Sequence, residues 1–204
     1  MDQWEKTATL IAHDLFKWSN NCLETQSLEH GGMPVCPFAG HEWESGQAMI
    51  HLTDDLEIVT QIKATFPPSA NQTHIIALTN IEDLSPEKLA QWTEEQNKKH
   101  FGVWLKSYHP ERTDTPFIPV HERPSDWPEV EDYAVIVMQS FERIVAASEE
   151  LVETPYYNYL SKEKIESVRQ RATMLETWQS LTDGPAYEPH DEHGIMLAQK
   201  GVFQ

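Results

Sequence analysis

The feature that most constrains the fold is a nearly continuous apolar run, HIIALT at residues 74–79, which has the length of a strand. Runs of this kind are typical of strands buried on both faces of a sheet. Helical patterns lie on either side of it. Asp55 is a suitable N-cap for a helix over 56–66, and Ser85 begins a second helix that extends to about Lys99. A buried strand between two helices predicts a sheet covered by helices.

Two further strands complete the alternation of strands and helices. Residues 47–53 precede the helix over 56–66, and residues 101–108 follow the helix that begins at Ser85. Because connections between parallel strands are right-handed, this order predicts a largely parallel sheet. We therefore expect an α/β fold with a mixed, largely parallel sheet of three or four strands, and an α+β arrangement stays open.

The remaining segments predict an N-terminal helix over 4–23, a fourth strand and two further helices. Residues 133–138 are ambiguous, since their β-branched residues indicate a strand while their apolar spacing also fits a helix. We favour a strand, followed by a helix that Ser140 caps and that extends to about Val152. The last helix begins after Ser161. Its buried face is predicted to comprise Ile165, Val168, Ala172, Leu175 and Trp178.

Length and charge limit the domain organisation and the partners. The chain of 204 residues is long enough for one well-packed core, and we expect one domain over 1–184 and a C-terminal tail over 185–204. A net charge of -18 disfavours nucleic acid and anionic membranes as partners. No long apolar run or export signal occurs, so we expect a soluble, cytoplasmic protein that acts on a small molecule. A homo-oligomer stays open.

The sequence lacks the motifs of several common enzyme classes. It contains no GxxxxGK[ST], GxGxxG, HExxH or GxSxG pattern. Their absence disfavours nucleoside triphosphate hydrolysis, Rossmann-type dinucleotide binding and the common arrangement of serine hydrolases.

The residues with the clearest chemical potential lie in the segment 34–44. Cys36 stands between two prolines, so we expect it on a rigid, non-helical loop. A thiolate beside an imidazolium is an effective nucleophile, which makes His41 and His109 candidate catalytic bases. The alternative is a buried structural thiol that packs with Phe38.

A second interpretation of this region is a metal site. Imidazole and carboxylate ligands together suit iron, manganese or zinc, and His41 and Glu44 are candidate ligands together with His109 and His121. His109 follows the third predicted strand, and ligands of open sheets bind at the carboxyl ends of strands. These spacings match no established ligand motif, so ordinary surface residues are the alternative.

The end of the third strand also carries candidate substrate-binding residues. Arg112 and Arg123 are rare positive charges in an acidic chain, and either guanidinium can clamp a carboxylate through two hydrogen bonds. Tyr108 lies next to this segment and is a third candidate. The competing explanation is surface ion pairing of the two arginines with Glu111 and Glu122.

Two segments of the chain resemble bacterial protein families of unknown function. Cys-Pro-Phe occurs at 36–38 after an N-terminal helix, and a glycine-containing strand ends in Tyr-His-Pro at 108–110, where those families have Phe-His-Pro. Arg-Pro-Ser at 123–125 then precedes the fourth strand. The resemblance covers about residues 4–147, and it implies a site that includes the cysteine and the histidine of these motifs.

Residues 36–39 are also similar to a segment of haem-dependent N-oxygenases of amino acids, which implies iron or haem as a cofactor. The leading hypothesis is a small-molecule enzyme, an oxidoreductase that carries out metal- or haem-assisted oxidation of an amino-acid-like substrate. Two alternatives stay open. One is covalent catalysis by Cys36 and His109 without a metal, and the other is a non-catalytic protein that binds a ligand or partner through the aromatic residues at 156–159.

Overall fold

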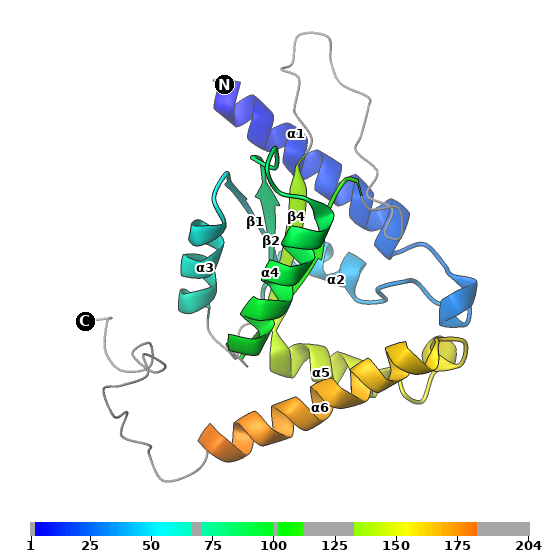
Figure 1. Ribbon diagram of the computed structural model, residues 1–204. Coiled ribbons are helices and arrows are strands. Elements are labelled where there is room, and N and C mark those ends of the chain that lie inside the picture. Colours follow the sequence, from blue (N-terminus) through cyan, green and yellow to red (C-terminus); the bar gives the residue numbers. More distant parts are fainter. Residues whose placement is uncertain (1–2, 67–70, 100–101, 112–132, 183–204) are drawn as a thin grey trace.

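The computed structural model describes residues 3–66, 71–99, 102–111 and 133–182, and it shows a four-stranded mixed sheet covered by helices (Figure 1). The α/β fold expected from the sequence is therefore confirmed. The strands are β1 (Ala48–Thr53), β2 (Thr73–Leu78), β3 (Val103–Tyr108) and β4 (Ala134–Ser140). The helices are α1 (Gln3–Trp18) with its π-helical continuation η1 (Ser19–Leu23), η2 (Leu28–His30), α2 (Ala39–Glu44), α3 (Leu56–Thr65), α4 (Pro86–Lys99), α5 (Phe141–Glu150), η3 (Pro155–Tyr157) and α6 (Lys162–Thr182).

The strands lie in the order β1-β2-β4-β3. β1 and β2 pair in parallel, whereas β4 pairs antiparallel with both β2 and β3. β1, β2 and β3 therefore point the same way, and β4 is inserted between the second and third of them. The ambiguous segment is a strand, and Ser140 caps α5 by accepting a hydrogen bond from the backbone N–H of Arg143 at 3.4 Å.

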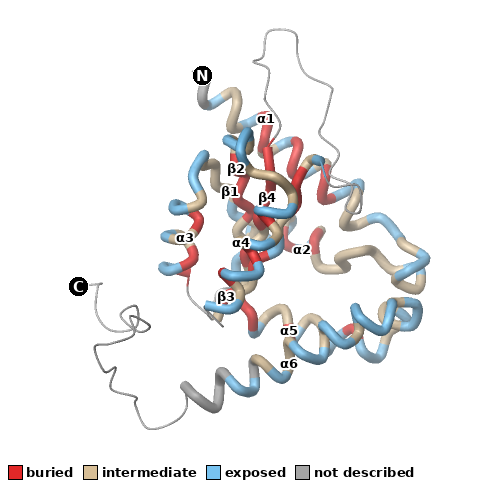
Figure 2. The backbone as a smooth tube through the Cα atoms, in the orientation of Figure 1, coloured by how far each residue is buried: buried red, intermediate tan, exposed pale blue. Residues whose placement is uncertain are grey.

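The two faces of the sheet carry separate apolar cores, and burial is concentrated in the strands (Figure 2). On one face, which we call the α4 face, Ile76 and Leu105 pack beneath α3 and α4. On the other, the α1 face, Ile75 and Val135 pack against Leu15 of α1. Each fully buried side chain of this kind contributes about 1.5–3 kcal/mol to stability, so the helices are fixed to the sheet from both sides.

Helix α6 is less buried than its sequence predicted. Among its described side chains none is fully buried, and Ile165, Val168 and Ala172 are only half-buried. Both sheet faces are already covered by other helices, so α6 packs on α5 and on Trp104 at the start of β3. Neither α6 nor any other helix in the described part of the chain is long and apolar enough to cross a membrane.

An ion pair between the partly buried Arg143 and the buried Glu42 joins α2 to α5 beside the amino ends of β1 and β2. The guanidinium of Arg143 donates to the carboxylate of Glu42 and, at 3.0 Å, to the side-chain oxygen of Gln47. The same carboxylate accepts a hydrogen bond from the hydroxyl of Thr73 at 2.9 Å. That hydroxyl in turn accepts one from Gln139 at 2.9 Å. The network links two helices and three strand ends, and it fixes α2 and α5 relative to the sheet.

We expect the substitution Arg143→Met to lower the free energy of unfolding by about 3–5 kcal/mol, because it leaves the Glu42 carboxylate buried without its cation. Urea denaturation measures this change. Glu44→Gln, on an exposed side chain of the same helix, is the control and should change stability by less than about 0.5 kcal/mol. A loss below about 1 kcal/mol for Arg143→Met would show that the ion pair does not anchor α5.

Two histidines on the α4 face of β1 and β2 are in direct contact. Nε2 of His51 lies 3.0 Å from Nδ1 of His74, a distance at which one neutral ring donates a hydrogen bond to the other. The ring of Phe66 packs edge-on against His74, with 4.8 Å between the centroids. Burial lowers the pKa of both histidines, and His51 lowers that of His74 further.

The histidine pair should make the protein less stable in mild acid. The folded-state pKa values lie below the ordinary value of 6.5, so the stabilisation is complete above that pH and is lost as the pH falls through the lowered values. We expect the double variant His51→Gln/His74→Gln to lose less stability than wild type between about pH 7.5 and about pH 5. Urea midpoints across this range measure the difference. Parallel declines in the two proteins would contradict it.

Candidate functional site

Trp104, Lys106 and Tyr108 of β3 lie on the α1 face, and they differ in which side chains pack on them. Tyr108 packs edge-on against Trp18, with 4.8 Å between ring centroids, and Trp104 stacks on Phe141 of α5 at 5.5 Å. Lys106 lies between them and is exposed, although the surrounding protein partly desolvates its ammonium group. Cys36, Tyr108 and Arg171 interact electrostatically with Lys106, and Tyr156 interacts with Cys36 and Arg171, so these side chains lie close together on one surface. We call this surface the β3 recess and define it by Cys36, Lys106, Tyr108, Tyr156 and Arg171.

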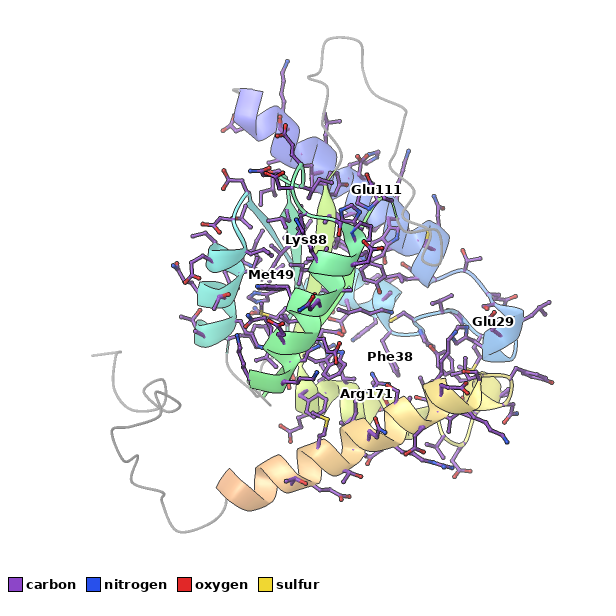
Figure 3. All side chains as sticks on the ribbon, in the orientation of Figure 1. Glu29, Phe38, Met49, Lys88, Glu111 and Arg171 are labelled. Carbon is purple, nitrogen blue, oxygen red and sulfur yellow. The ribbon has the colours of Figure 1, made fainter. Side chains whose placement is uncertain are left out.

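Two sides of the recess come from distant parts of the chain. The Cys36 loop precedes α2, next to the labelled Phe38 in Figure 3, whereas the labelled Arg171 belongs to α6. The hydroxyl of Tyr156 in η3 donates a hydrogen bond to the carbonyl of Val35, and this contact joins the Cys36 loop to the segment between α5 and α6. The recess is therefore assembled by tertiary contacts and not by one local motif.

A close contact between η2 and η3 supports this junction. Gly31 has a φ of 65°, and a Cβ atom at this position would lie 2.5 Å from the carbonyl oxygen of Pro155. Both the conformation and the close approach require glycine. Next to it, the ring of His30 packs against that of Tyr156 with 4.6 Å between centroids. The two connecting segments consequently form one continuous wall.

The loop that carries Cys36 is held by backbone hydrogen bonds. The N–H of Cys36 donates to the carbonyl of Leu23 at the end of η1, at 2.7 Å. Burial raises the pKa of the Cys36 thiol, and the backbone N–H groups of Phe38 and Ala39, together with the charge of Lys106, lower it only in part. The thiol is therefore protonated near neutral pH, which is unfavourable for a nucleophile.

Two cations of the recess have no carboxylate partner among the described residues. The ammonium of Lys106 lies 5.0 Å from the ring centroid of Tyr108, and Tyr108 raises its pKa. The guanidinium of Arg171 lies 5.8 Å from the ring centroid of Trp104. Its Nε atom is buried and has no hydrogen-bond partner in the described part of the chain. Burial lowers the pKa of Arg171, while Tyr157 and Tyr156 act in the opposite direction.

The position of these cations suits an anionic ligand. Arg171 is one of the groups that lower the pKa of Lys106, so the two charges repel each other. A carboxylate between them would relieve this repulsion and could accept hydrogen bonds from the ammonium of Lys106 and from the terminal N–H groups of Arg171. The aromatic rings of Trp104 and Tyr108 provide apolar contacts beside the charges.

The structure does not bring Cys36 and His109 together as the sequence predicted. Nε2 of His109 lies 2.7 Å from the carbonyl of Leu84, and its Nδ1 accepts a hydrogen bond from the N–H of Glu111 at 3.2 Å. Leu84 precedes α4, so the ring lies on the α4 face while Cys36 lies on the α1 face. The cause is the alternation of side chains along a strand, which directs Tyr108 and His109 to opposite faces. Both nitrogens of His109 bind the backbone.

The other predicted site residues are dispersed or not described. His41 and Glu44 are exposed on α2, and no three His, Cys, Asp or Glu side chains gather into a metal site within residues 3–66, 71–99, 102–111 and 133–182. His121, Arg112 and Arg123 lie outside the described residues, as does the tail. The metal site and the roles of these arginines therefore stay predictions. Tyr108, a predicted substrate-binding residue, does lie in the recess.

Sequence reasoning missed Lys106 and Arg171 as members of the recess, and it considered Tyr156 only within the aromatic segment 156–159 of a non-catalytic binding protein. The sequence did contain a signal for Lys106. Successive side chains of a strand alternate between its two faces, so Lys106 shares one face with Trp104 and Tyr108. The other two come from segments whose position depends on how α5 and α6 pack, and no local pattern shows that.

Comparison of the chain with protein-family models, with curated proteins and with solved structures returns no match. The resemblance to bacterial families of unknown function accordingly stays a prediction. The geometry of the recess is the basis for a functional proposal.

We expect Cys36 to react with iodoacetamide more slowly than glutathione does at about pH 7.5, because its pKa is raised. Mass spectrometry of a Cys22→Ala variant would give the rate at Cys36 alone. The same variant unfolded in urea is the control and should react at the ordinary rate of a free cysteine. A rate in the folded protein at or above that of glutathione would restore Cys36 as a candidate nucleophile.

Proposed function

We propose that the β3 recess binds a small molecule through a carboxylate group and that this molecule is the substrate of the protein. The observation that carries the proposal is the pair of cations, Lys106 and Arg171, which interact with each other and have no carboxylate partner among the described residues. A chain with a net charge of -18 has many carboxylates available to neutralise them. The lack of a carboxylate partner for both cations within the described residues therefore supports a site for an external anion.

The chemistry of the recess supports an amphiphilic ligand. Arg171 offers a planar guanidinium that binds a carboxylate through two parallel hydrogen bonds, and Lys106 adds a second positive charge. Trp104 and Tyr108 lie beside these charges and favour an apolar or aromatic body next to the carboxylate. This combination suits an amino-acid-like substrate, the class expected from the sequence.

The reaction itself is proposed from the sequence alone. The raised pKa of Cys36 and the engagement of both nitrogens of His109 weigh against covalent catalysis by these two residues, which leaves an oxidation assisted by iron or haem as the reaction expected from the sequence. No described residue is assigned as a ligand of such a cofactor. Elemental analysis and an absorption spectrum of the purified full chain test this part of the proposal. A colourless protein that gains no stability from added iron or haem would contradict it.

Binding can be tested with 3-phenylpropanoate as the anionic probe and 3-phenylpropanamide as its neutral counterpart. We expect calorimetry to detect the carboxylate and to give at least tenfold weaker binding of the amide, since a charge-assisted hydrogen bond contributes about 1.5–3 kcal/mol. Arg171→Gln should weaken binding of the carboxylate by a factor of about 10–100 for the same reason.

The matched control for this experiment is Arg169→Gln, which removes the same charge from an exposed position of α6 two residues earlier. Its affinity for the probe should stay close to that of wild type. Equal losses in the two variants would indicate a general charge effect and would contradict a site at Arg171. Equal binding of the acid and the amide would contradict recognition of a carboxylate.

A further inference from the structure

A second group of side chains with ligand chemistry lies on the α4 face, across the sheet from the β3 recess. His51 and His74 contact each other through ring nitrogens 3.0 Å apart. Met49 is paired directly with His74 in the register of β1 and β2, and it stands two residues before His51 on the same face of β1. Figure 3 shows Met49 in the region between α3 and α4.

We propose that His51, His74 and Met49 form a binding site for a soft monovalent metal ion, Cu(I). The spacing of the nitrogens supports this. Two nitrogens bonded to one ion at about 2.0–2.1 Å with a tetrahedral angle lie about 3.3 Å apart, so the present separation needs only a small adjustment. The ion would take the place of the proton that the two rings now share.

The protonation state of the rings suits this exchange. Each neutral imidazole has one N–H and one nitrogen with a free lone pair. At present one of the two facing nitrogens carries its proton, and a tautomer change moves that proton to the outer nitrogen of the same ring. Both facing nitrogens then have lone pairs for the metal, and the rings need not lose a proton to the solvent.

Met49 determines which metal the site prefers. A thioether is a soft ligand that favours Cu(I), whereas zinc prefers thiolate, imidazole and carboxylate. The side chain of Met49 is 40% exposed, so an ion has access from the solvent, and the unbranched methionine can adjust its sulfur position. His74 is flanked by Met49 of β1 on one side and by Met138 of β4 on the other. Met138 is fully buried, so the site is shielded from solvent on that side.

This site does not depend on the proposed function of the recess, because the sheet separates the two. Two apolar residues adjoin His74, the ring of Phe66 edge-on and Met138 through the register of β2 and β4. Apart from the two histidines, no charged group is among the causes of their lowered pKa values. A cation would therefore meet no competing positive charge from these neighbours.

The test titrates the full chain with Cu(I) under anaerobic, reducing conditions, with bicinchoninate as the competing chelator. We expect one ion to bind per chain. Loss of a residue that only hydrogen-bonds a metal ligand typically weakens metal binding by about 10–100-fold. Because His51→Gln removes a ligand itself, it should weaken Cu(I) binding by at least about a hundredfold. Met49→Leu should weaken Cu(I) binding by about tenfold and leave Zn(II) binding unchanged.

Two controls separate this site from general metal binding and from the recess. His13→Gln, at an exposed position of α1, and Arg171→Gln should both bind Cu(I) as wild type does. In wild type, nitrogen NMR should show both facing ring nitrogens shifting with one equivalent of Cu(I), which gives a readout that requires no variant. Unchanged affinity in His51→Gln, or ring nitrogens that do not shift, would overturn the proposal. Zn(II) binding tighter than Cu(I) binding would overturn the choice of metal.

Discussion

The ion pair between Glu42 and Arg143 is the interaction on which the arrangement of the molecule most depends. Glu42 belongs to α2, which directly follows the Cys36 loop, and Arg143 belongs to α5, which leads to η3 and α6. The ion pair therefore connects the elements that carry the two sides of the β3 recess, alongside the stacking of Phe141 on Trp104. A buried ion pair gains little net stability because both charges lose their hydration, but its geometry is specific. Here that specificity sets the separation of the two sides.

The recess itself carries a cost in stability. Lys106 and Arg171 repel each other, and the buried Nε of Arg171 has no partner among the described residues, so this arrangement is less favourable than an apolar surface of the same shape. Groups of this kind are typically retained where a ligand offsets the cost. Helix α6 is suited to this role, because its half-buried side chains pack on α5 and leave Arg171 directed to the recess.

Local sequence patterns predicted most of the secondary structure, because caps and apolar spacing act within a few residues. Ser140, for example, marked the boundary between β4 and α5 correctly. The order of the strands and the shallow packing of α6 depend on contacts between distant residues, which no local pattern contains. The candidate site divides in the same way. Cys36 was found from its flanking prolines, whereas the choice of His109 neglected that it follows Tyr108 by one position and so faces the other side of the sheet.

The acidic character of the chain also bears on how the recess would work. A net charge of -18 repels an approaching anion at long range, so the affinity for a carboxylate must come from contacts inside the recess. At physiological ionic strength charges are screened beyond about 8 Å, and this weakens the long-range repulsion more than it weakens short hydrogen bonds to a partly buried guanidinium. Under the proposed function, the recess would therefore select ligands by the position of their carboxylate relative to Arg171 and Lys106, and the acidic surface would disfavour anions that lack this fit.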